Sequence, residues 1–264
     1  MLKLCALASI YDGEKASLFE KCLQSLRAQT FNVDIFLIVD GPIRDELKKV
    51  ILKNSDVFKD VWYLEENRGL AAALNKAIEK IPPSYSHVIR FDTDDINVEG
   101  RFKLIHDNLR ADTDLLASGM YEHDLESAKL KARKVNCNFG IGTFRFTNSI
   151  FHPTVAFKLS TMRHLGGYDE VPGFEDWATW IKFAQNNCNF VPIDEPLVLF
   201  SWDSNLINRR FGWHYLQKEY TFYKFRRQSK YFRFHTDLIF LVSRFGKYIL
   251  GKWFTSKLFQ WRSL

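Results

Sequence analysis

Three aspartates, Asp92, Asp94 and Asp95, lie within four residues, directly after an apolar run, His87–Ile89, that predicts a buried strand. Side chains of an extended segment alternate between faces, so Asp92 and Asp94 point to the same side. Two close carboxylates repel each other unless a cation lies between them. Mn²⁺ and Mg²⁺ prefer oxygen ligands and often take others from a bound phosphate. The triplet therefore predicts a metal-assisted nucleotide diphosphate site, with a solvated turn as the alternative.

Another carboxylate, Asp40, follows the strand-like run Ile35–Val39. An aspartate at the carboxyl end of a parallel strand is well placed to accept hydrogen bonds from a base or a ribose. The alternative interpretation is a turn residue, because Gly41 and Pro42 come next.

Glu175 and Asp176 open a predicted helix far along the chain from the triplet. Free backbone N–H groups and the helix dipole stabilise carboxylates at such a position, so capping is one interpretation. The other is a general base, since a catalytic site is assembled from segments that are distant in sequence.

The elements that must position these residues alternate between strand and helix through about the first 95 residues. Because the strand-like runs are of the buried type, we expect a parallel, doubly wound sheet of the nucleotide-binding kind. The expected strands are 2–10, 35–39, 61–64 and 87–89, and the expected helices are one that ends near 29, 44–53 and 70–81.

After residue 101 the alternation breaks down, and residues 123–150 are expected to be irregular. The helix that opens near residue 173 has an apolar stripe formed by Trp177, Trp180, Ile181 and Ala184. The other expected elements are helices over 102–109 and up to 164, and strands over 115–121, 152–157 and 197–200.

The chain of 264 residues is 46% hydrophobic, which is enough for one large domain with a core and an appendage. Its four cysteines have no C-x-x-C spacing, so we expect reduced thiols in a cytosolic protein. The apolar run after Lys3 is too short for a signal peptide. No window of about 18 apolar residues predicts a membrane span.

The net charge of +6 is unevenly distributed along the chain. Residues 205–264 hold 13 Lys and Arg against 2 Asp and Glu, a net charge of +11, and 17 of the 41 aromatic residues. Residues 1–204 carry a net charge of −5. A basic, aromatic tail on a mildly acidic body predicts different roles for the two parts.

Helices are expected over 209–228 and 237–253 in this tail, the second with Arg244, Lys247 and Lys252 off its apolar stripe. A basic amphipathic helix can lie in a membrane interface, or it can cover the body or a partner in a homodimer. Nucleic acid is not expected as a partner, because no recognised motif supports it. The stripe consists of Leu238, Leu241, Val242, Phe245, Ile249 and Trp253.

A series of short motifs runs between residues 9 and 180. They are Ser9-Ile10-Tyr11, Gln29-Thr30, Val39-Asp40-Gly41, Asn67-Arg68-Gly69-Leu70, Ala73-Leu74-Asn75, Arg90-Phe91-Asp92-Thr93-Asp94-Asp95, Arg101-Phe102, His152-Pro153-Thr154, Gly166-Gly167-Tyr168 and Glu175-Asp176-x-x-x-Trp180. In this order they resemble the inverting family-2 glycosyltransferases with a GT-A fold, especially bacterial enzymes of capsule, O-antigen or exopolysaccharide synthesis. The GT-A fold is an α/β, Rossmann-like fold whose mixed, mostly parallel sheet is flanked by helices.

The resemblance implies how a nucleotide-sugar would be held. Asp40 would accept a hydrogen bond from the uracil of a UDP-sugar, and Tyr11 and Asp12 would frame the nucleotide. Asp94 would ligate Mn²⁺ or Mg²⁺ at the diphosphate, and Asp92 would contact the ribose or the nucleotide–metal unit.

Further roles follow from the same resemblance. Asp176 would be the general base, beside Glu175 as a second catalytic carboxylate. The remaining residues are Arg68 and Arg90, which would stabilise phosphate or orient Asp92, Asn75 at the nucleotide-sugar, and His152 and Trp177 at the acceptor.

The implied activity is metal-dependent, inverting transfer of a sugar from a UDP-sugar to a hydroxyl of a saccharide acceptor, commonly lipid-linked, in bacterial surface polysaccharide synthesis. The implied organisation is a GT-A domain over 1–204, with a nucleotide-binding half (1–100) and an acceptor-binding half (101–204), and a C-terminal helical extension over 205–264. The resemblance implies a cytoplasmic protein, peripheral on the inner face of the plasma membrane.

One stretch departs from the family, because Phe200-Ser201-Trp202-Asp203 stands where a Tyr-Arg-x-His-like sequence is common. His214, Arg209 and Arg210 are candidates to replace its contacts. Two alternatives remain at this point: a non-catalytic sugar-nucleotide-binding or scaffolding subunit, and a sugar nucleotidyltransferase. Residues 9–14 hold a single glycine, which disfavours the phosphate loop of the second.

Overall fold

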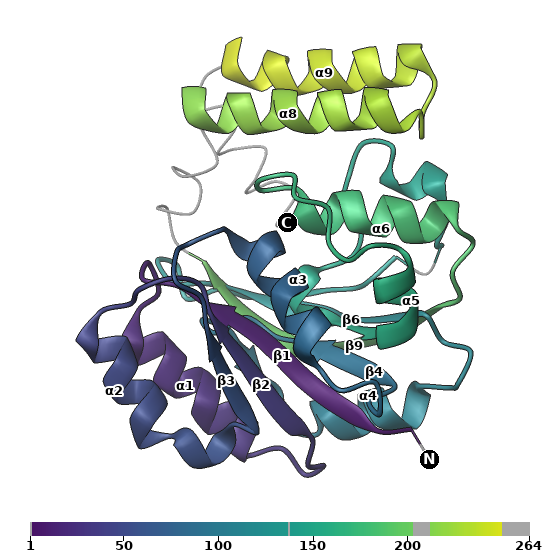
Figure 1. Ribbon diagram of the computed structural model, residues 1–264. Helices are drawn as coiled ribbons and strands as arrows, with labels where there is room; N and C mark the ends of the chain where they lie inside the picture. The colour runs from purple at the N-terminus through teal and green to yellow at the C-terminus, as the bar shows by residue number, and fades with distance from the viewer. Residues whose placement is uncertain (1, 137, 203–211, 250–264) are drawn as a thin grey trace.

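The computed structural model describes residues 2–136, 138–202 and 212–249, and a mixed sheet forms the middle layer of this part of the chain (Figure 1). The strands are β1 (Leu4–Ile10), β2 (Asp34–Val39), β3 (Asp60–Tyr63), β4 (His87–Arg90), β5 (Ile96–Asn97), β6 (Leu115–Asp124), β7 (Leu130–Arg133), β8 (Val155–Lys158) and β9 (Phe190–Trp202). Their order in the sheet is β3-β2-β1-β4-β8-β6-β9-β5, and β7 pairs with β6 at the side of this path.

Helices cover both faces of the sheet. They are α1 (Ala16–Arg27), α2 (Asp45–Lys53), α3 (Leu70–Lys80), α4 (Arg101–Asn108), α5 (Leu159–His164), α6 (Glu175–Gln185), α8 (Trp213–Ser229) and α9 (Phe234–Ile249), with 3₁₀ helices η1 (Ser55–Val57), η2 (Ile141–Phe144) and η3 (His152–Thr154). One core lies between the sheet and α1, α2 and α4, and the other lies under α3, α5 and α6.

The first half of the sheet is parallel, as the alternating pattern predicts, because β3, β2, β1 and β4 all pair in parallel. β1 has β2 on one side and β4 on the other, and α1 and α3 lie on opposite faces. This is the topological switch point at which open α/β sheets form a crevice at the carboxyl ends of their strands.

The second half makes the sheet mixed, as the resemblance implies, because β8 runs antiparallel to both β4 and β6. Residues 123–150 are not wholly irregular: β6 continues to Asp124 and forms a hairpin with β7. β7 is a short edge strand whose side chains alternate only weakly between exposed and half-buried. Its pairing with β6 therefore defines it more than its sequence pattern does. β5 was missed because its two residues become a strand only by pairing with β9.

The C-terminal helices form an antiparallel pair over α6 (Figure 1). Phe222 of α8 stacks on Phe174 with ring centroids 4.6 Å apart, and Phe240 of α9 meets Trp177 at 5.8 Å. Between the helices, the guanidinium of Arg226 donates to Asp237 at 2.9 Å, and both side chains are fully buried. Of the alternatives left open for the tail, packing on the body applies to α8 and to the inner face of α9.

Some expectations fall outside the described residues, namely the boundary at 204/205, Arg209, Arg210 and Trp253. The division into a domain over 1–204 and an extension over 205–264 therefore stays a prediction. Across the described ranges, no helix combines the length and the apolar run that a membrane crossing requires.

The buried ion pair gives a stability prediction. Asp237→Ala leaves the guanidinium of Arg226 buried without its carboxylate, so we expect the free energy of unfolding to fall by about 3–5 kcal/mol in urea denaturation. Glu79→Ala, which removes the exposed Lys76–Glu79 pair, is the control and should change much less. Equal losses in the two variants would contradict a stabilising role for the buried pair.

Candidate active site

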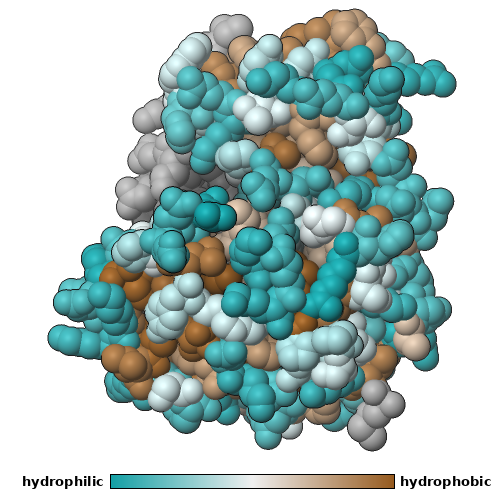
Figure 2. Space-filling model, in the orientation of Figure 1, coloured by the Kyte–Doolittle hydropathy of each residue, from teal (hydrophilic) through white to brown (hydrophobic). Residues whose placement is uncertain are grey.

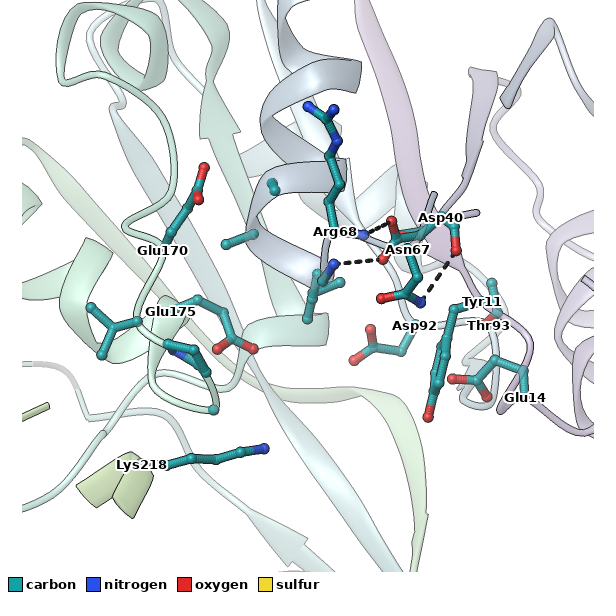
Figure 3. A pocket seen from close by; sticks show the side chains of 18 of the residues that line it. Tyr11, Glu14, Asp40, Asn67, Arg68, Asp92, Thr93, Glu170, Glu175 and Lys218 are labelled. Carbon is teal, nitrogen blue, oxygen red and sulfur yellow. Dashed lines mark hydrogen bonds between the residues drawn. The ribbon is translucent and has the colours of Figure 1, made fainter. Parts of the chain in front are cut away.

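A cavity of about 470 Å³ lies at the carboxyl ends of β1, β2 and β4, where the topology predicts a ligand (Figure 3). The start of α3, the loop before α6 and one residue of α8 complete its wall. The lining residues are Ser9, Tyr11, Glu14, Asp40, Asn67, Arg68, Gly69, Leu70, Ala71, Ala72, Asp92, Thr93, Asp94, Glu170, Val171, Pro172, Gly173, Glu175 and Lys218.

Asp40 joins the end of β2 to the start of α3. Its two carboxylate oxygens accept hydrogen bonds from the backbone N–H groups of Arg68 at 2.8 Å and Gly69 at 2.9 Å, and the residue is 3% exposed. Gly41 has a φ of 82°, and a Cβ there would clash with the backbone nitrogen of Asn67. The turn interpretation of Asp40 therefore has structural support, although each oxygen keeps a lone pair for a ligand.

The acidic triplet divides between the cavity and the interior. Asp92 and Asp94 both line the cavity, and the fully buried guanidinium of Arg90 donates a hydrogen bond to Asp92. Asp95 points inward, and its carboxylate has no hydrogen-bond partner in the described part of the chain. Burial, followed by repulsion from Asp92 and Asp94, raises the pKa of Asp95 well above its ordinary value.

The donor set at the triplet fits a divalent ion that shares its coordination with a substrate. No cluster of three or more His, Cys, Asp or Glu side chains forms a metal site within the described ranges. The cavity instead offers the carboxylates of Asp92 and Asp94, and oxygen donors are those that Mn²⁺ and Mg²⁺ accept. Two carboxylates suffice where phosphate and water supply the other ligands.

Tyr11 and Asp12 follow β1 directly, and their side chains lie in different places. Tyr11 lines the cavity and is partly exposed, beside Glu14 (Figure 3). The side chain of Asp12 lies outside the lining and accepts a hydrogen bond from the backbone N–H of Arg44 at 2.6 Å. This hydrogen bond ties the turn after β1 to Arg44, the residue that precedes α2.

Arg68 and Asn75 also differ in their placement. The side chain of Arg68 lies at the cavity and forms an ion pair with Glu66 at 3.0 Å. Asn75 lies outside this cavity, where its side chain donates to the carbonyl of Tyr168 at 2.9 Å and accepts from its N–H at 2.7 Å. Asn75 thus connects α3 to the loop that precedes α6.

The two carboxylates at the start of α6 point in different directions. Glu175 lines the cavity on the side facing Asp92 (Figure 3). Burial raises the pKa of Glu175, although backbone hydrogen bonds and then Lys218 partly oppose this. Asp176 lies outside the lining, and its carboxylate accepts hydrogen bonds from Asn148 at 2.7 Å and from the backbone N–H of Trp177 at 2.7 Å.

The two residues expected at the acceptor, His152 and Trp177, lie behind the cavity wall. His152 is within hydrogen-bond distance of the Tyr168 hydroxyl, at 3.1 Å, and burial together with repulsion from Arg90 lowers the pKa of His152 to about 3. Its imidazole is therefore neutral at physiological pH. Trp177 is 4% exposed and donates to the carbonyl of Phe144 at 3.1 Å. Neither side chain lines the cavity.

Three charged residues of the cavity lining were not singled out from the sequence: Glu14, Glu170 and Lys218. Lys218 is the least expected, because it comes from α8 and brings a cation to an acidic cavity (Figure 3). No sequence signal distinguishes it from the other basic residues of that helix. Asn67 and Thr93 also line the cavity, and they lie inside motifs that the sequence did indicate.

Residues 10–164 match the family described as Glycosyl transferase family 2. The match covers more than half of the chain, and the chain therefore belongs to glycosyl transferase family 2. This confirms the family predicted from the motifs, identifies the protein as a glycosyltransferase, and favours an enzyme over the non-catalytic alternative.

Two known proteins are similar over nearly the whole chain. The UDP-Gal:alpha-D-GlcNAc-diphosphoundecaprenol beta-1,3-galactosyltransferase of Escherichia coli is 31% identical over 253 residues, which cover 92% of this chain and 90% of that protein. The Amylovoran biosynthesis glycosyltransferase AmsE of Erwinia amylovora is 29% identical over 243 residues, which cover 90% of this chain and 91% of that protein.

Solved structures confirm the predicted GT-A fold. TarS 1–349 of S. aureus in complex with UDP-GlcNAc has a TM-score of 0.65 at 17% identity, over 92% of this chain and 72% of that one. This chain covers 43% of the length of a longer TarS structure. The mannosyltransferase PcManGT from Pyrobaculum calidifontis, in complex with GDP-Man and Mn²⁺, has a TM-score of 0.62 at 16% identity, over 88% of this chain and 65% of that one.

The buried position of Glu175 predicts a pH-dependent stability. Because folding raises its pKa, the stability that this group contributes is complete below its unfolded pKa of about 4.3 and is lost as the pH rises through the folded pKa. We therefore expect Glu175→Gln to be more stable than the wild type at neutral pH and equally stable near pH 4.

Thermal denaturation over this pH range measures the effect. Glu170→Gln is the matched control, because Glu170 lines the same cavity with an exposed carboxylate and should give no pH-dependent gain. A gain for Glu175→Gln that does not change with pH would argue against burial as its cause.

Proposed function

We propose that this glycosyltransferase transfers a sugar from a UDP-sugar to a hydroxyl of a saccharide acceptor, with inversion at the anomeric carbon. The observation that carries the proposal is one cavity with Asp92 on one side and the start of α6, at Glu175, on the other (Figure 3), and Asp94 also lines it. A donor diphosphate and an acceptor hydroxyl require these two kinds of carboxylate on opposite sides of the sugar. The uridine donor is further supported by the E. coli relative, whose name specifies UDP-Gal.

The acceptor is proposed to be a lipid-linked saccharide in bacterial surface polysaccharide synthesis. Both relatives support this assignment by name, one through amylovoran biosynthesis and the other through a diphosphoundecaprenol-linked GlcNAc. A diphosphate on the acceptor adds negative charge near the reacting sugar. Lys218 provides a cation at the cavity that can contact either diphosphate.

Mn²⁺ or Mg²⁺ is the proposed cofactor, held by Asp94 with Asp92. When bound, the ion would neutralise the charge that develops on the departing UDP. The donor set of two cavity carboxylates supports this assignment, as does the Mn²⁺ in the structure of PcManGT. Arg90 would keep Asp92 oriented toward the cavity, because its buried guanidinium donates to that carboxylate.

At the nucleotide, Asp40 and Tyr11 would contact the uridine. Asp40 is held by two backbone N–H groups at the end of β2, so its free lone pairs have a defined direction. Arg68, at the start of α3, would contact phosphate. Asp12 and Asn75 would act indirectly, because each forms a hydrogen bond to a backbone segment next to the cavity.

The acceptor hydroxyl must lose a proton as it attacks the anomeric carbon, and the start of α6 is proposed to supply the base. Asp176 is the base that the family resemblance implies, and hydrogen bonds from Asn148 and the Trp177 N–H orient its carboxylate. Glu175 is the second candidate, favoured by its place in the cavity and its raised pKa. The acceptor contacts expected of His152 and Trp177 stay predictions.

Nucleotide binding tests the donor and metal assignments. By isothermal titration calorimetry, we expect UDP to bind more tightly with Mn²⁺ than without it, and more tightly than GDP or TDP. Asp94→Asn should weaken the Mn²⁺-dependent binding by at least about tenfold, because it removes a charged ligand. Asp112→Asn, at an exposed position away from the cavity, is the control. Selective binding of GDP or TDP would overturn the donor assignment, and equal binding without metal would overturn the cofactor.

Amide substitutions at the start of α6 test the base. With UDP-Gal and a synthetic lipid-diphosphate GlcNAc, we expect Asp176→Asn to lower kcat for UDP release by about 10²–10⁴-fold while UDP affinity is unchanged. Glu175→Gln makes the same carboxylate-to-amide change at the residue next to Asp176, and serves as the comparison. A comparable loss in Glu175→Gln with full activity in Asp176→Asn would transfer the role to Glu175. Full activity in both variants would refute a base at this helix terminus.

A further inference from the structure

The apolar stripe of α9 faces outward. Its members, each between 36% and 63% exposed, are Phe234, Leu238, Ile239, Val242 and Phe245, which we call the α9 stripe. Positions 234, 238, 242 and 245 follow the helical repeat and therefore share one side of the helix. Hydrophobic side chains gather at the top of the molecule, over α9, in Figure 2. An amphipathic helix of a globular domain ordinarily turns its apolar stripe toward the core.

The side of α9 that faces the body carries charged residues, Asp237 and Arg244, besides the buried Phe240. Asp237 accepts hydrogen bonds from Arg226 at 2.9 Å and Arg227 at 3.0 Å. Arg244 lies over the ring of Trp177 at 5.4 Å and donates to the carbonyl of Phe146 at 3.2 Å. Rolling the helix to bury its stripe would break these buried ion pairs and hydrogen bonds, so the outward orientation is held in place.

The charge of this surface is of one sign. The two acidic residues of the segment 205–264, Glu219 and Asp237, are both fully buried. Lys224, Lys230 and Arg233 of α8 and the following turn are exposed. The carboxylates of the extension are thus withdrawn from solvent, and its exposed charges are cations. One cation borders the α9 stripe directly, because the guanidinium of Arg227 lies over the ring of Phe234 at 5.1 Å.

We propose that the α9 stripe docks the protein onto an anionic lipid bilayer, with the apolar side chains in the interface and the flanking cations against the lipid phosphates. An apolar stripe bordered by cations matches the acyl boundary and charged headgroups of such a surface. A second copy of the chain fits less well, because a twofold contact would bring like-charged surfaces together. Docking through α9 leaves α8 between the membrane and α6, with Lys218 of α8 at the cavity.

The full chain can be tested by flotation with vesicles of phosphatidylcholine, with and without phosphatidylglycerol. We expect binding only when phosphatidylglycerol is present, weakening as salt is added. Ile239→Ser with Val242→Ser should reduce binding by at least about tenfold, since it removes the apolar contact. Lys224→Gln with Lys230→Gln should reduce it by about fivefold for each charge.

Leu52→Ser with Leu130→Ser is the matched control, because these apolar side chains are equally exposed but lie on α2 and β7. The control should bind vesicles like the wild type. Failure of the wild type to float, or equal flotation of the stripe variant, would overturn the proposal. A dimer detected by light scattering that the stripe variant converts to a monomer would assign the face to a second copy instead.

Any role of this docking in the use of a lipid-linked acceptor rests on the proposed function, but the docking itself does not. UDP binding separates the two, because the stripe variant should bind UDP and Mn²⁺ as the wild type does. If the wild type does not bind UDP, the proposed function is wrong, but the vesicle result still holds.

Discussion

Negative charge at the carboxyl end of β4 is the constraint on which the rest of the site depends. Three carboxylates lie within four residues there, and one of them, Asp95, is buried. Two fully buried arginines offset this charge: Arg90 donates to Asp92, and Arg101 donates to the carbonyls of Arg90 at 2.7 Å and Pro153 at 2.6 Å. The same guanidinium groups that balance the charge therefore tie β4 to α4 and η3. Asp92 and Asp94 can face the cavity because positive charge and hydrogen bonds are already in place behind them.

The opposite wall depends on contacts between segments that are far apart along the chain. Asn75 binds the backbone of Tyr168 through both ends of its amide, which sets the loop before α6 and with it the position of Glu175. Phe222 stacks on Phe174 at the start of the same helix, so α8 supports the wall from outside. The extension thus contributes to the cavity in two ways, by packing on α6 and by bringing Lys218 to its edge.

The buried strands β1, β2 and β4 and the helices between them are predictable to within a few residues, because apolar runs and helical periodicity are local signals. β5 and β7 are not predictable in this way, because they exist through pairing with β9 and β6. For the site, Asp92, Asp94, Asp40 and Glu175 were indicated by their place at the ends of elements. Glu14, Glu170 and Lys218 carry no such mark, since only folding brings them to the cavity.

The sequence by itself determined the α/β class, the ordered family motifs and the acidic cluster after the fourth strand, because each is written in neighbouring residues. Only the tertiary structure decided which carboxylate at the start of α6 faces the cavity: Glu175 and not Asp176. It also decided that the side of α9 with Asp237 and Phe240 packs on the body and the apolar stripe faces out. The physical reason is that spacing along a chain defines which side chains share a face, whereas burial and ion pairing between distant segments select the face that turns inward.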